Sequence, residues 1–192
     1  MQGGHSDICS KAILKVFYPL SKIYGFVVKT RIFFYKRDIL KTVRLPVPVI
    51  SVGNITVGGT GKTPIVEYIS RYLQKKGKRV AILSRGYAAT IKQENSSFVN
   101  HVCNDEYLLF QENIPDIPNL LNKDRVKSGR EAISHFQAEY LVLDDGFQHR
   151  AVKAGLNIIL TDYSNLFTRD FFLPTGDLRD ERRSYKRAEI II

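Results

Sequence analysis

The sequence predicts an α/β fold: a mostly parallel β-sheet with helices on both faces, preceded by an N-terminal amphipathic helix. In residues 45–192, short apolar runs rich in β-branched residues alternate with helical segments. Continuous apolar strands that alternate with helices are typical of a parallel sheet buried on both faces. Residues 1–44 are instead basic, with apolar residues at helical spacing. We therefore expect two parts, a helical segment over 1–44 and an α/β core over 45–192.

The composition is that of a globular protein with a cationic surface. The 192 residues are 44% hydrophobic and 25% charged, with a formal net charge of +10, which excludes a disordered chain. The two cysteines, Cys9 and Cys103, exclude a disulfide scaffold and a cysteine-based zinc site, and they fit a reducing, cytoplasmic setting. The charge favours a phosphorylated substrate, an anionic membrane or nucleic acid as partner. No nucleic acid is expected, because no zinc-finger, RNP-type or helix-turn-helix signature is present.

The first 44 residues hold most of the positive charge, with nine Lys and Arg residues against two Asp residues. Between Ile13 and Val28, apolar residues recur at i, i+3, i+4 and i+7, which predicts an amphipathic helix. Pro19 is expected to kink this helix or divide it in two. A basic amphipathic helix can lie on an anionic membrane surface, but its apolar stripe can also pack on the domain behind it. The sequence leaves these two interpretations open.

A glycine-rich loop follows the first predicted strand. We expect the strand over residues 46–53, the loop over 54–63 and a helix over 64–76, which is the context of a P-loop. In such a loop glycine N–H groups surround phosphate oxygens, the lysine reaches the β- and γ-phosphates, and the last hydroxyl ligates Mg²⁺. Position 56 is Thr, where the strict pattern has Gly. The core is therefore predicted to be P-loop NTPase-like, and the loop residues assigned to ATP are Gly58, Gly59, Thr60, Gly61, Lys62 and Thr63.

Further strands are expected after the P-loop, over residues 78–83, 140–145, 156–160 and 188–192, and a helix is expected to end over residues 131–138. Each strand candidate is a mainly apolar run, as in strands buried on both faces. Together with the strand before the P-loop they would form the parallel sheet.

Two pairs of acidic residues stand where carboxylates can act. Asp144 and Asp145 end the strand predicted over 140–145. Open α/β sheets place ligand groups at the carboxyl ends of strands, and a P-loop protein needs an acid there for Mg²⁺. Adjacent strand residues point to opposite faces, so we expect only one of the two to face the metal directly. Asp105 and Glu106 precede another apolar helical run, and by themselves they indicate a helix N-terminus.

Three more side chains are candidates on chemical grounds alone. Arg125 and Arg179 can clamp phosphate, but arginines without such a role are common at protein surfaces. His149 follows the third predicted strand in a turn, where it either contacts substrate or has no function. The residues by themselves do not decide between these alternatives.

Five motifs occur together in an order that resembles the tetraacyldisaccharide 4′-kinases, the lipid A 4′-kinases of outer-membrane bacteria. They are Val52–Pro64, Leu83–Tyr87, Asn104–Glu106, Leu143–Arg150 and Leu173–Arg179. The resemblance implies a Mg²⁺-dependent transfer of the ATP γ-phosphate to the 4′-hydroxyl of a tetraacylated glucosamine disaccharide 1-phosphate. It also implies a location at the cytoplasmic face of the bacterial inner membrane. Members of that family have a second lobe, so the resemblance implies that this chain is an N-terminal part.

The resemblance assigns roles to single residues as well. Lys62 and Thr63 would hold nucleotide and metal. Asp144 and Asp145 would form the acid pair on the metal side, with Asp144 as a metal ligand and Asp145 as a catalytic residue alongside Lys62. Asp105 would be the base that accepts the proton of the sugar hydroxyl. The other residues that would line the nucleotide and substrate cleft are Tyr87, Arg125 and Arg179.

A second interpretation is a membrane-associated P-loop NTPase that acts as a switch without a lipid acceptor. Guanine selection would need Asn-Lys-x-Asp, and residues 122–124 read Asn-Lys-Asp without the spacer, which disfavours a guanine-nucleotide switch. A non-enzymatic basic adaptor would leave the P-loop and the strand-end acids unexplained. Asp180 stands where the kinase family usually has Glu, which weakens a metal or phosphate role at that position.

Overall fold

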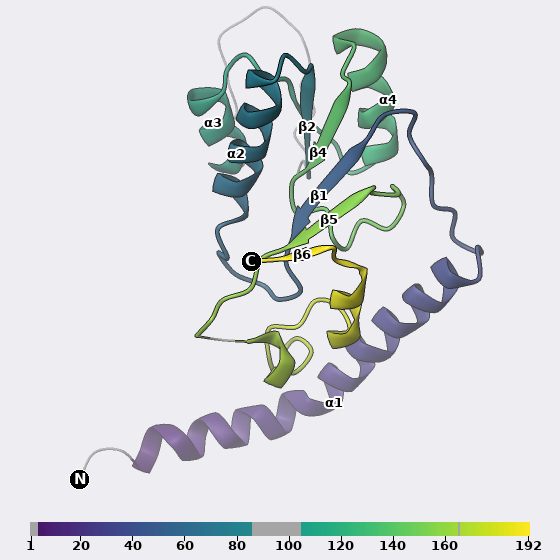
Figure 1. The fold of residues 1–192 in the computed structure, drawn as a ribbon. Helices are drawn as coiled ribbons and strands as arrows, with labels where there is room; N and C mark the ends of the chain where they lie inside the picture. Colours follow the sequence, from purple (N-terminus) through teal and green to yellow (C-terminus); the bar gives the residue numbers. More distant parts are fainter. Residues whose placement is uncertain (1–3, 86–104, 165) are drawn as a thin grey trace, which may run out of the picture.

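The computed structural model describes residues 4–85, 105–164 and 166–192, which form a six-stranded sheet with flanking helices (Figure 1). The strand order is β3-β2-β4-β1-β5-β6, and every neighbouring pair is parallel. The strands are β1 (Val49–Gly53), β2 (Val80–Ser84), β3 (Asn119–Leu121), β4 (Tyr140–Leu143), β5 (Leu156–Ile159) and β6 (Ile190–Ile191). The helices are α1 (Gly4–Lys36), α2 (Lys62–Lys75), α3 (Asp105–Asn113) and α4 (Arg125–Phe136), with two 3₁₀ helices, η1 (Phe167–Arg169) and η2 (Arg182–Arg187).

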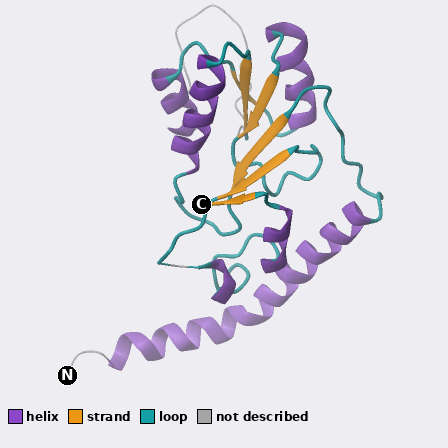
Figure 2. Ribbon diagram, in the orientation of Figure 1, coloured by secondary structure: helices purple, strands orange, loops and turns teal. Residues whose placement is uncertain are grey.

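Helices cover both faces of the sheet, and this part of the fold prediction is confirmed (Figure 2). On one face, Val66 of α2 and Phe110 of α3 belong to a single apolar cluster with the strands. On the other face, Ala132 of α4 packs in a second cluster with Leu83 and Leu141. All five side chains are at most 1% exposed. Burial of β1, β2 and β4 on both faces explains why their sequences are almost continuously apolar.

The register brings two functional loops to one edge of the sheet. β1 and β4 are neighbours, with Ser51 opposite Leu143. The glycine-rich loop leaves β1 after Gly53, and Asp144 follows β4 directly after Leu143. The P-loop and the acid pair therefore lie at the carboxyl ends of adjacent parallel strands, as the sequence predicted.

The acid pair differs from the prediction in its backbone. β4 ends at Leu143, so Asp144 and Asp145 lie in a turn and not in the strand. Asp145 has a φ of 48°, in the left-handed region that few non-glycine residues adopt. The expectation that the two side chains point to opposite faces rested on strand geometry, and it does not apply to a turn.

Other boundaries differ for local reasons. β1 begins at Val49 rather than at residue 46, since Pro46 and Pro48 have no N–H to donate to a ladder. The strand predicted over 188–192 is reduced to Ile190–Ile191. β3 was not predicted at all, because it has only three residues and none of them is fully buried.

Helix α1 packs on the domain through a narrow face of mostly small residues. It continues through Pro19, so the proline does not divide it, and its axis bends in Figure 1. Ser21 and Ile32 are 5% and 6% exposed, and Gly25 between them is buried. At 3.6 residues per turn the bulky apolar residues fall largely on the opposite side. Those that are 38–70% exposed are Phe17, Tyr18, Leu20, Ile23, Phe26, Val27, Phe33 and Phe34.

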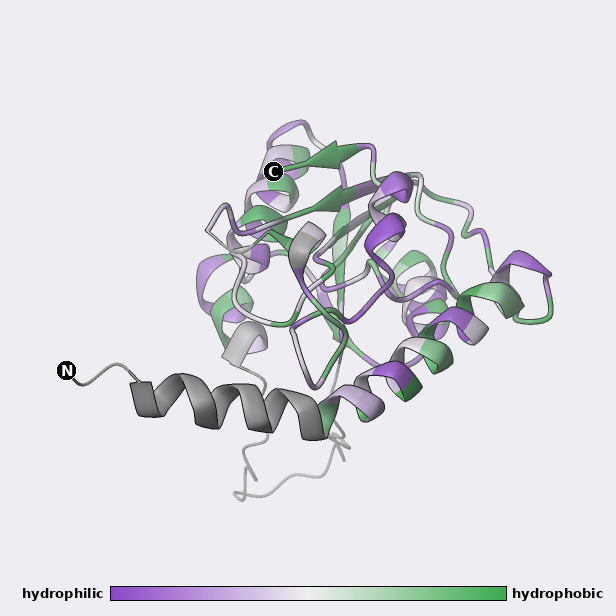
Figure 3. Ribbon diagram, turned by 90° about the horizontal axis from the view of Figure 1, so that it is seen from below, coloured by the Kyte–Doolittle hydropathy of each residue, from purple (hydrophilic) through white to green (hydrophobic). Residues whose placement is uncertain are grey.

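The structure shows that α1 packs on the domain, whereas the membrane interpretation of the N-terminal segment stays a prediction. Most of the large apolar residues of α1 nevertheless face solvent, and in Figure 3 green hydrophobic residues and hydrophilic residues alternate along the coloured part of the helix. Within the described ranges, no helix is both long and apolar enough to cross a membrane.

Candidate functional site

The glycine-rich loop has the backbone conformation that its sequence requires. Gly58 and Gly61 have φ values of 114° and 76°, a region that is strained for residues with a side chain. The Lys62 ammonium folds back over the loop and donates to the Gly58 carbonyl at 3.3 Å. α2 begins at Lys62, so its N-terminal N–H groups face the loop, and such a helix end favours phosphate. The loop therefore offers backbone donors, a cation and a helix dipole to one anion.

The buried side chain of Asn54 forms hydrogen bonds with residues of this loop. Asn54 is 0% exposed, and its amide nitrogen donates to the Gly58 carbonyl at 3.4 Å and to the Thr60 hydroxyl at 3.0 Å. Its backbone carbonyl accepts a hydrogen bond from Gln148 Nε2 at 2.6 Å. Its side-chain oxygen accepts one from Arg179 Nη2. Neither Asn54 nor Gln148 was predicted as a site residue, although a polar residue between a buried strand and a glycine-rich loop was an available signal.

Arg179 and Arg125 converge on Asp145. Arg179 donates from Nη1 and Nη2 to the two carboxylate oxygens of Asp145, at 2.9 and 2.7 Å, while Arg125 donates to the Asp145 carbonyl at 3.0 Å. Burial by itself would raise the pKa of Asp145. The hydrogen bonds and charge of Arg179, with the charges of Lys62 and Arg125, outweigh burial and hold that pKa below its ordinary value. Asp145 is therefore an ionised carboxylate held within the electrostatic reach of the P-loop lysine.

Asp144 and Thr63 supply oxygen donors at the same edge. The Asp144 carboxyl is 1% exposed at the end of β4, beside the strand that leads into the P-loop. Across the described part of the chain, no three His, Cys, Asp or Glu side chains gather as a metal site. A site with one or two carboxylates and a hydroxyl suits Mg²⁺, which keeps several waters and is completed by phosphate oxygens. The donor set at this edge therefore fits Mg²⁺ bound together with a nucleotide.

A basic cavity separates α1 from the acid turn. It has a volume of about 480 Å³, and its walls come from α1, from the Asp145–Arg150 turn and from Arg179. Six cationic side chains line it against two acidic ones, Asp145 and Asp180, and those two already accept hydrogen bonds from arginines. The cations are Arg31, Arg85, Lys123, Arg125, Arg150 and Arg179. An anionic group bound here would lie next to the candidate nucleotide site.

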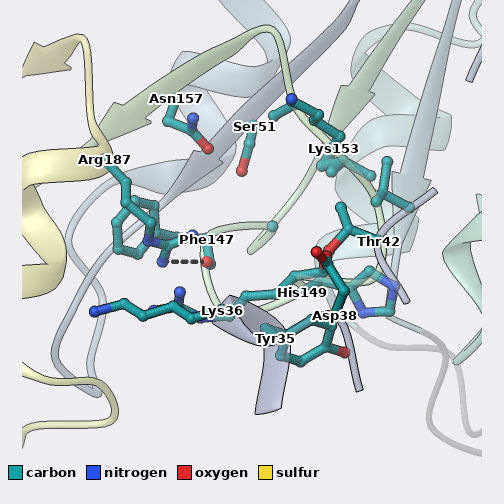
Figure 4. Close-up of a pocket in the computed structure, with 15 residues that line it drawn as sticks. Tyr35, Lys36, Asp38, Thr42, Ser51, Phe147, His149, Lys153, Asn157 and Arg187 are labelled. Carbon is teal, nitrogen blue, oxygen red and sulfur yellow. Dashed lines mark hydrogen bonds between the residues drawn. The ribbon is translucent and has the colours of Figure 1, made fainter. Parts of the chain in front are cut away.

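A second cavity, of about 590 Å³, lies beneath the same turn (Figure 4). Arg187 stacks over the Phe147 ring at 4.1 Å and donates to the Phe147 carbonyl at 2.9 Å. His149 lines both cavities. Burial, together with the charges of Arg125 and Arg31, lowers the pKa of His149 to about 4. The imidazole is therefore neutral at pH 7, and its Nε2 is buried.

Asp180 is enclosed in a polar network. Its carboxylate accepts from Arg150 at 3.2 Å, from Arg187 at 3.3 Å and from the Ser184 hydroxyl at 2.9 Å, and the side chain is 4% exposed. These contacts tie the residue after Arg179 to the turn that carries Arg150 and to η2. Asp180 therefore serves protein contacts, which agrees with the weak case for a metal or phosphate role.

The protein family of this chain is identified by its similarity to known proteins. The family model described as tetraacyldisaccharide-1-P 4′-kinase matches residues 13–192, which is nearly the whole chain. The chain belongs to this family. The resemblance inferred from the five motifs is thereby confirmed.

Individual members of the kinase family align over most of the chain. A tetraacyldisaccharide 4′-kinase of Flavobacterium psychrophilum is 44% identical over 185 residues, which cover 93% of this chain and 53% of the relative. One from Porphyromonas gingivalis is 40% identical and has 50% of its length covered. A crystal structure of LpxK from Aquifex aeolicus in complex with ATP superposes with a TM-score of 0.78 at 36% identity, covering 93% of this chain and 58% of that one. The chain thus spans about half the length of these relatives.

The site residues predicted from the resemblance to the kinase family fall into two groups. The P-loop residues, Asp144, Asp145, Arg125 and Arg179 lie at one edge of the sheet. Tyr87 lies outside the described residues. Asp105 begins α3, but its side chain lies outside the description, so its role as a base stays a prediction.

Proposed function

We propose that the protein containing this chain transfers the γ-phosphate of ATP to the 4′-hydroxyl of a tetraacyldisaccharide 1-phosphate. The observation that carries this proposal is the convergence of the P-loop, Lys62, Arg179 and Asp145 at one sheet edge, in a chain of the tetraacyldisaccharide 4′-kinase family. The ATP complex of the Aquifex aeolicus relative supports ATP as the phosphate donor.

The P-loop would bind and orient the triphosphate. Its N–H groups and the Lys62 ammonium would stabilise charge on the β- and γ-phosphate oxygens, which is the main catalytic contribution in phosphoryl transfer. Thr63 and Asp144 would hold Mg²⁺, and the ion would neutralise charge on the phosphate oxygens. Asp145, kept ionised by Arg179, would orient the polar groups around that ion. Asp105 remains the predicted base for the sugar hydroxyl.

The acceptor would lie between α1 and the acid turn. The basic cavity there has the charge to bind the phosphate and sugar hydroxyls of a disaccharide 1-phosphate. The exposed apolar residues of α1 border the same side of the molecule, since Val27 and Val28 line the cavity. This placement lets acyl chains extend along the helix while the sugar reaches the nucleotide site.

The protein would act as a peripheral protein on an anionic membrane, at the cytoplasmic face of the bacterial inner membrane. The bulky apolar residues of α1 point away from the domain, and Lys22, Lys29 and Lys36 recur every seven residues along one flank of that stripe. An interfacial helix buries such a stripe among lipid headgroups while its lysines contact anionic lipids.

The kinase proposal is tested with Lys62→Ala in the complete protein that contains this chain. We expect lipid phosphorylation to fall by about 10²-fold or more, as when a main electrostatic contact of the transition state is lost. Lys76→Ala, at the other end of α2, is the matched control and should keep normal turnover. Near-normal phosphorylation by a folded Lys62→Ala variant would overturn the proposal. ATP hydrolysis that does not need the disaccharide acceptor would favour the switch interpretation instead.

The membrane proposal is tested with Phe26→Ser, because Phe26 is 70% exposed on α1. Removing one phenylalanine that would be largely buried in the interface should weaken binding to vesicles containing phosphatidylglycerol by about 10-fold. Binding should also fall as salt is raised. Tyr68→Ser is the control, since Tyr68 is 68% exposed on α2. Equal vesicle binding by the Phe26 variant and the parent protein would contradict an interfacial role for α1.

A further inference from the structure

Helix α1 approaches the domain closely where Gly25 meets Phe172. A Cβ atom at position 25 would lie 2.7 Å from Cδ2 of Phe172, so the ring packs directly on the helix backbone. The Ser21 hydroxyl donates to the Phe172 carbonyl, and the rings of Tyr24 and Phe172 are 6.2 Å apart. Glycine weakens a helix interior, so its presence here is explained by the close approach of the ring.

Phe172 belongs to a short segment, residues 171–179, which also contacts the P-loop. Val57 N–H donates to the Asp177 carbonyl, and Arg179 N–H donates to the Ile55 carbonyl, each at 2.8 Å. Between them, Leu178 is 1% exposed and shares a buried cluster with Ile55, against which Phe172 packs. Residues 171–179 therefore lie between α1 and the entry to the P-loop, in contact with both.

The same segment carries the arginine of the acid turn. Tyr24 of α1 donates from its hydroxyl to the Arg179 carbonyl at 3.3 Å, and the Arg179 side chain binds both Asp145 and Asn54. A displacement of residues 171–179 would therefore shift the guanidinium that holds Asp145 and the asparagine that supports the P-loop.

We propose that α1 positions the candidate nucleotide site, in addition to its proposed membrane role, through the contact of Gly25 with Phe172. The contact fixes residues 171–179, and these fix Arg179 and the first residues of the P-loop. Gly25 and Phe172 are positioning residues, since neither of them is among the residues that line the basic cavity or belongs to the P-loop. The inference rests on the proposed nucleotide site, but the structural coupling exists whether or not the protein is a kinase.

The experiment replaces Gly25 by Ala and by Leu in the complete protein in detergent solution. Alanine and leucine both favour helix more than glycine does. A loss of exchange protection or of ATP affinity in these variants therefore cannot come from a weaker helix. We expect faster amide hydrogen exchange at Val57 and Arg179, and a KM for ATP raised about 3-fold by Ala and 10-fold or more by Leu, with a smaller change in kcat. Gly155→Ala is the matched control, because a Cβ there would meet only the Val49 carbonyl, at 3.8 Å.

A second variant distinguishes a positioning effect from a general loss of structure. In Gly25→Leu combined with Phe172→Ala, the smaller side chain makes room for leucine, and exchange at Val57 and Arg179 should return towards the parent value. If the Leu variant does not fold, the Ala variant and this double variant still give the comparison. Unchanged exchange and an unchanged KM for ATP in a folded Gly25 variant would overturn the inference. Hydrogen exchange needs no catalysis, so this outcome is distinct from a failure of the kinase proposal.

Discussion

Removal of the Asp180 carboxylate should destabilise the fold strongly, with or without Mg²⁺. Asp180→Ala deletes the acceptor for Arg150, Arg187 and Ser184 and leaves two guanidinium groups facing each other in a largely enclosed site. A metal ligand would behave differently, since its loss would change stability only where the ion is bound. The variant therefore distinguishes a structural anion from a metal ligand at this position.

The magnitude follows from the burial of the network. The side chains of Asp180 and Arg150 are 4% and 12% exposed, whereas that of Arg187 is 33% exposed. Breaking a buried ion pair by removing one partner costs about 3–5 kcal/mol. Because Arg187 can turn towards water, we expect the lower part of that range, about 3 kcal/mol. For a chain of this size such a loss lowers the Tm by about 10 °C.

The assay is urea and thermal unfolding followed by circular dichroism in Mg²⁺-free buffer. Asp180→Asn should lie between the parent and Asp180→Ala, because the amide keeps the size and one acceptor oxygen but loses the charge. Glu112→Ala is the control, since Glu112 is exposed near the end of α3, and its effect should lie within the error of the measurement. A loss of less than about 1 kcal/mol for Asp180→Ala, the range of exposed ion pairs, would refute the reasoning.

Two further predictions concern the effects of His149 and Asp124 on the stability of the fold. His149 has a pKa of about 4 in the fold against 6.5 ordinarily, so the unfolded chain binds more protons between these values. Stability should therefore fall as the pH is lowered through this window, and urea unfolding of His149→Gln should show a flatter pH dependence. The Asp124 side chain caps α4 by accepting N–H groups of Val126 and Lys127, so Asp124→Ala should cost about 1 kcal/mol in the same assay. An unchanged urea midpoint for Asp124→Ala would show that this cap does not stabilise the fold.

The order of the elements and the P-loop were predictable because they depend on local patterns. Closely spaced glycines, a Lys-Thr pair and a following helical run are all visible within residues 54–76. The parallel sheet was predictable because apolar runs between helices have few other ways to be buried. Short or partly exposed elements such as β3 have no comparable pattern, and they were missed.

The geometry of the site was harder to predict, because it depends on pairs far apart in sequence. Arg179 and Asp145 are 34 residues apart, and neither motif indicates which distant residue its side chain contacts. The left-handed backbone of Asp145 is uncommon for a non-glycine residue, so a strand was the natural prediction. In α1 the periodicity predicted an amphipathic helix, but it could not show that Ser21 and Gly25, rather than the bulky residues, face the domain.

The separation in sequence between α1 and its docking segment also orders the events of folding. Tyr24 and Arg179 are 155 residues apart, and Asn54 and Arg179 are 125 apart. During synthesis the helix and the P-loop therefore leave the ribosome long before the segment that joins them. Contacts over such spans form late, because local structure forms faster than distant pairings. The apolar stripe of α1 is thus present on the nascent chain before the nucleotide site can assemble, so the proposed membrane contact would be able to precede the completion of the P-loop.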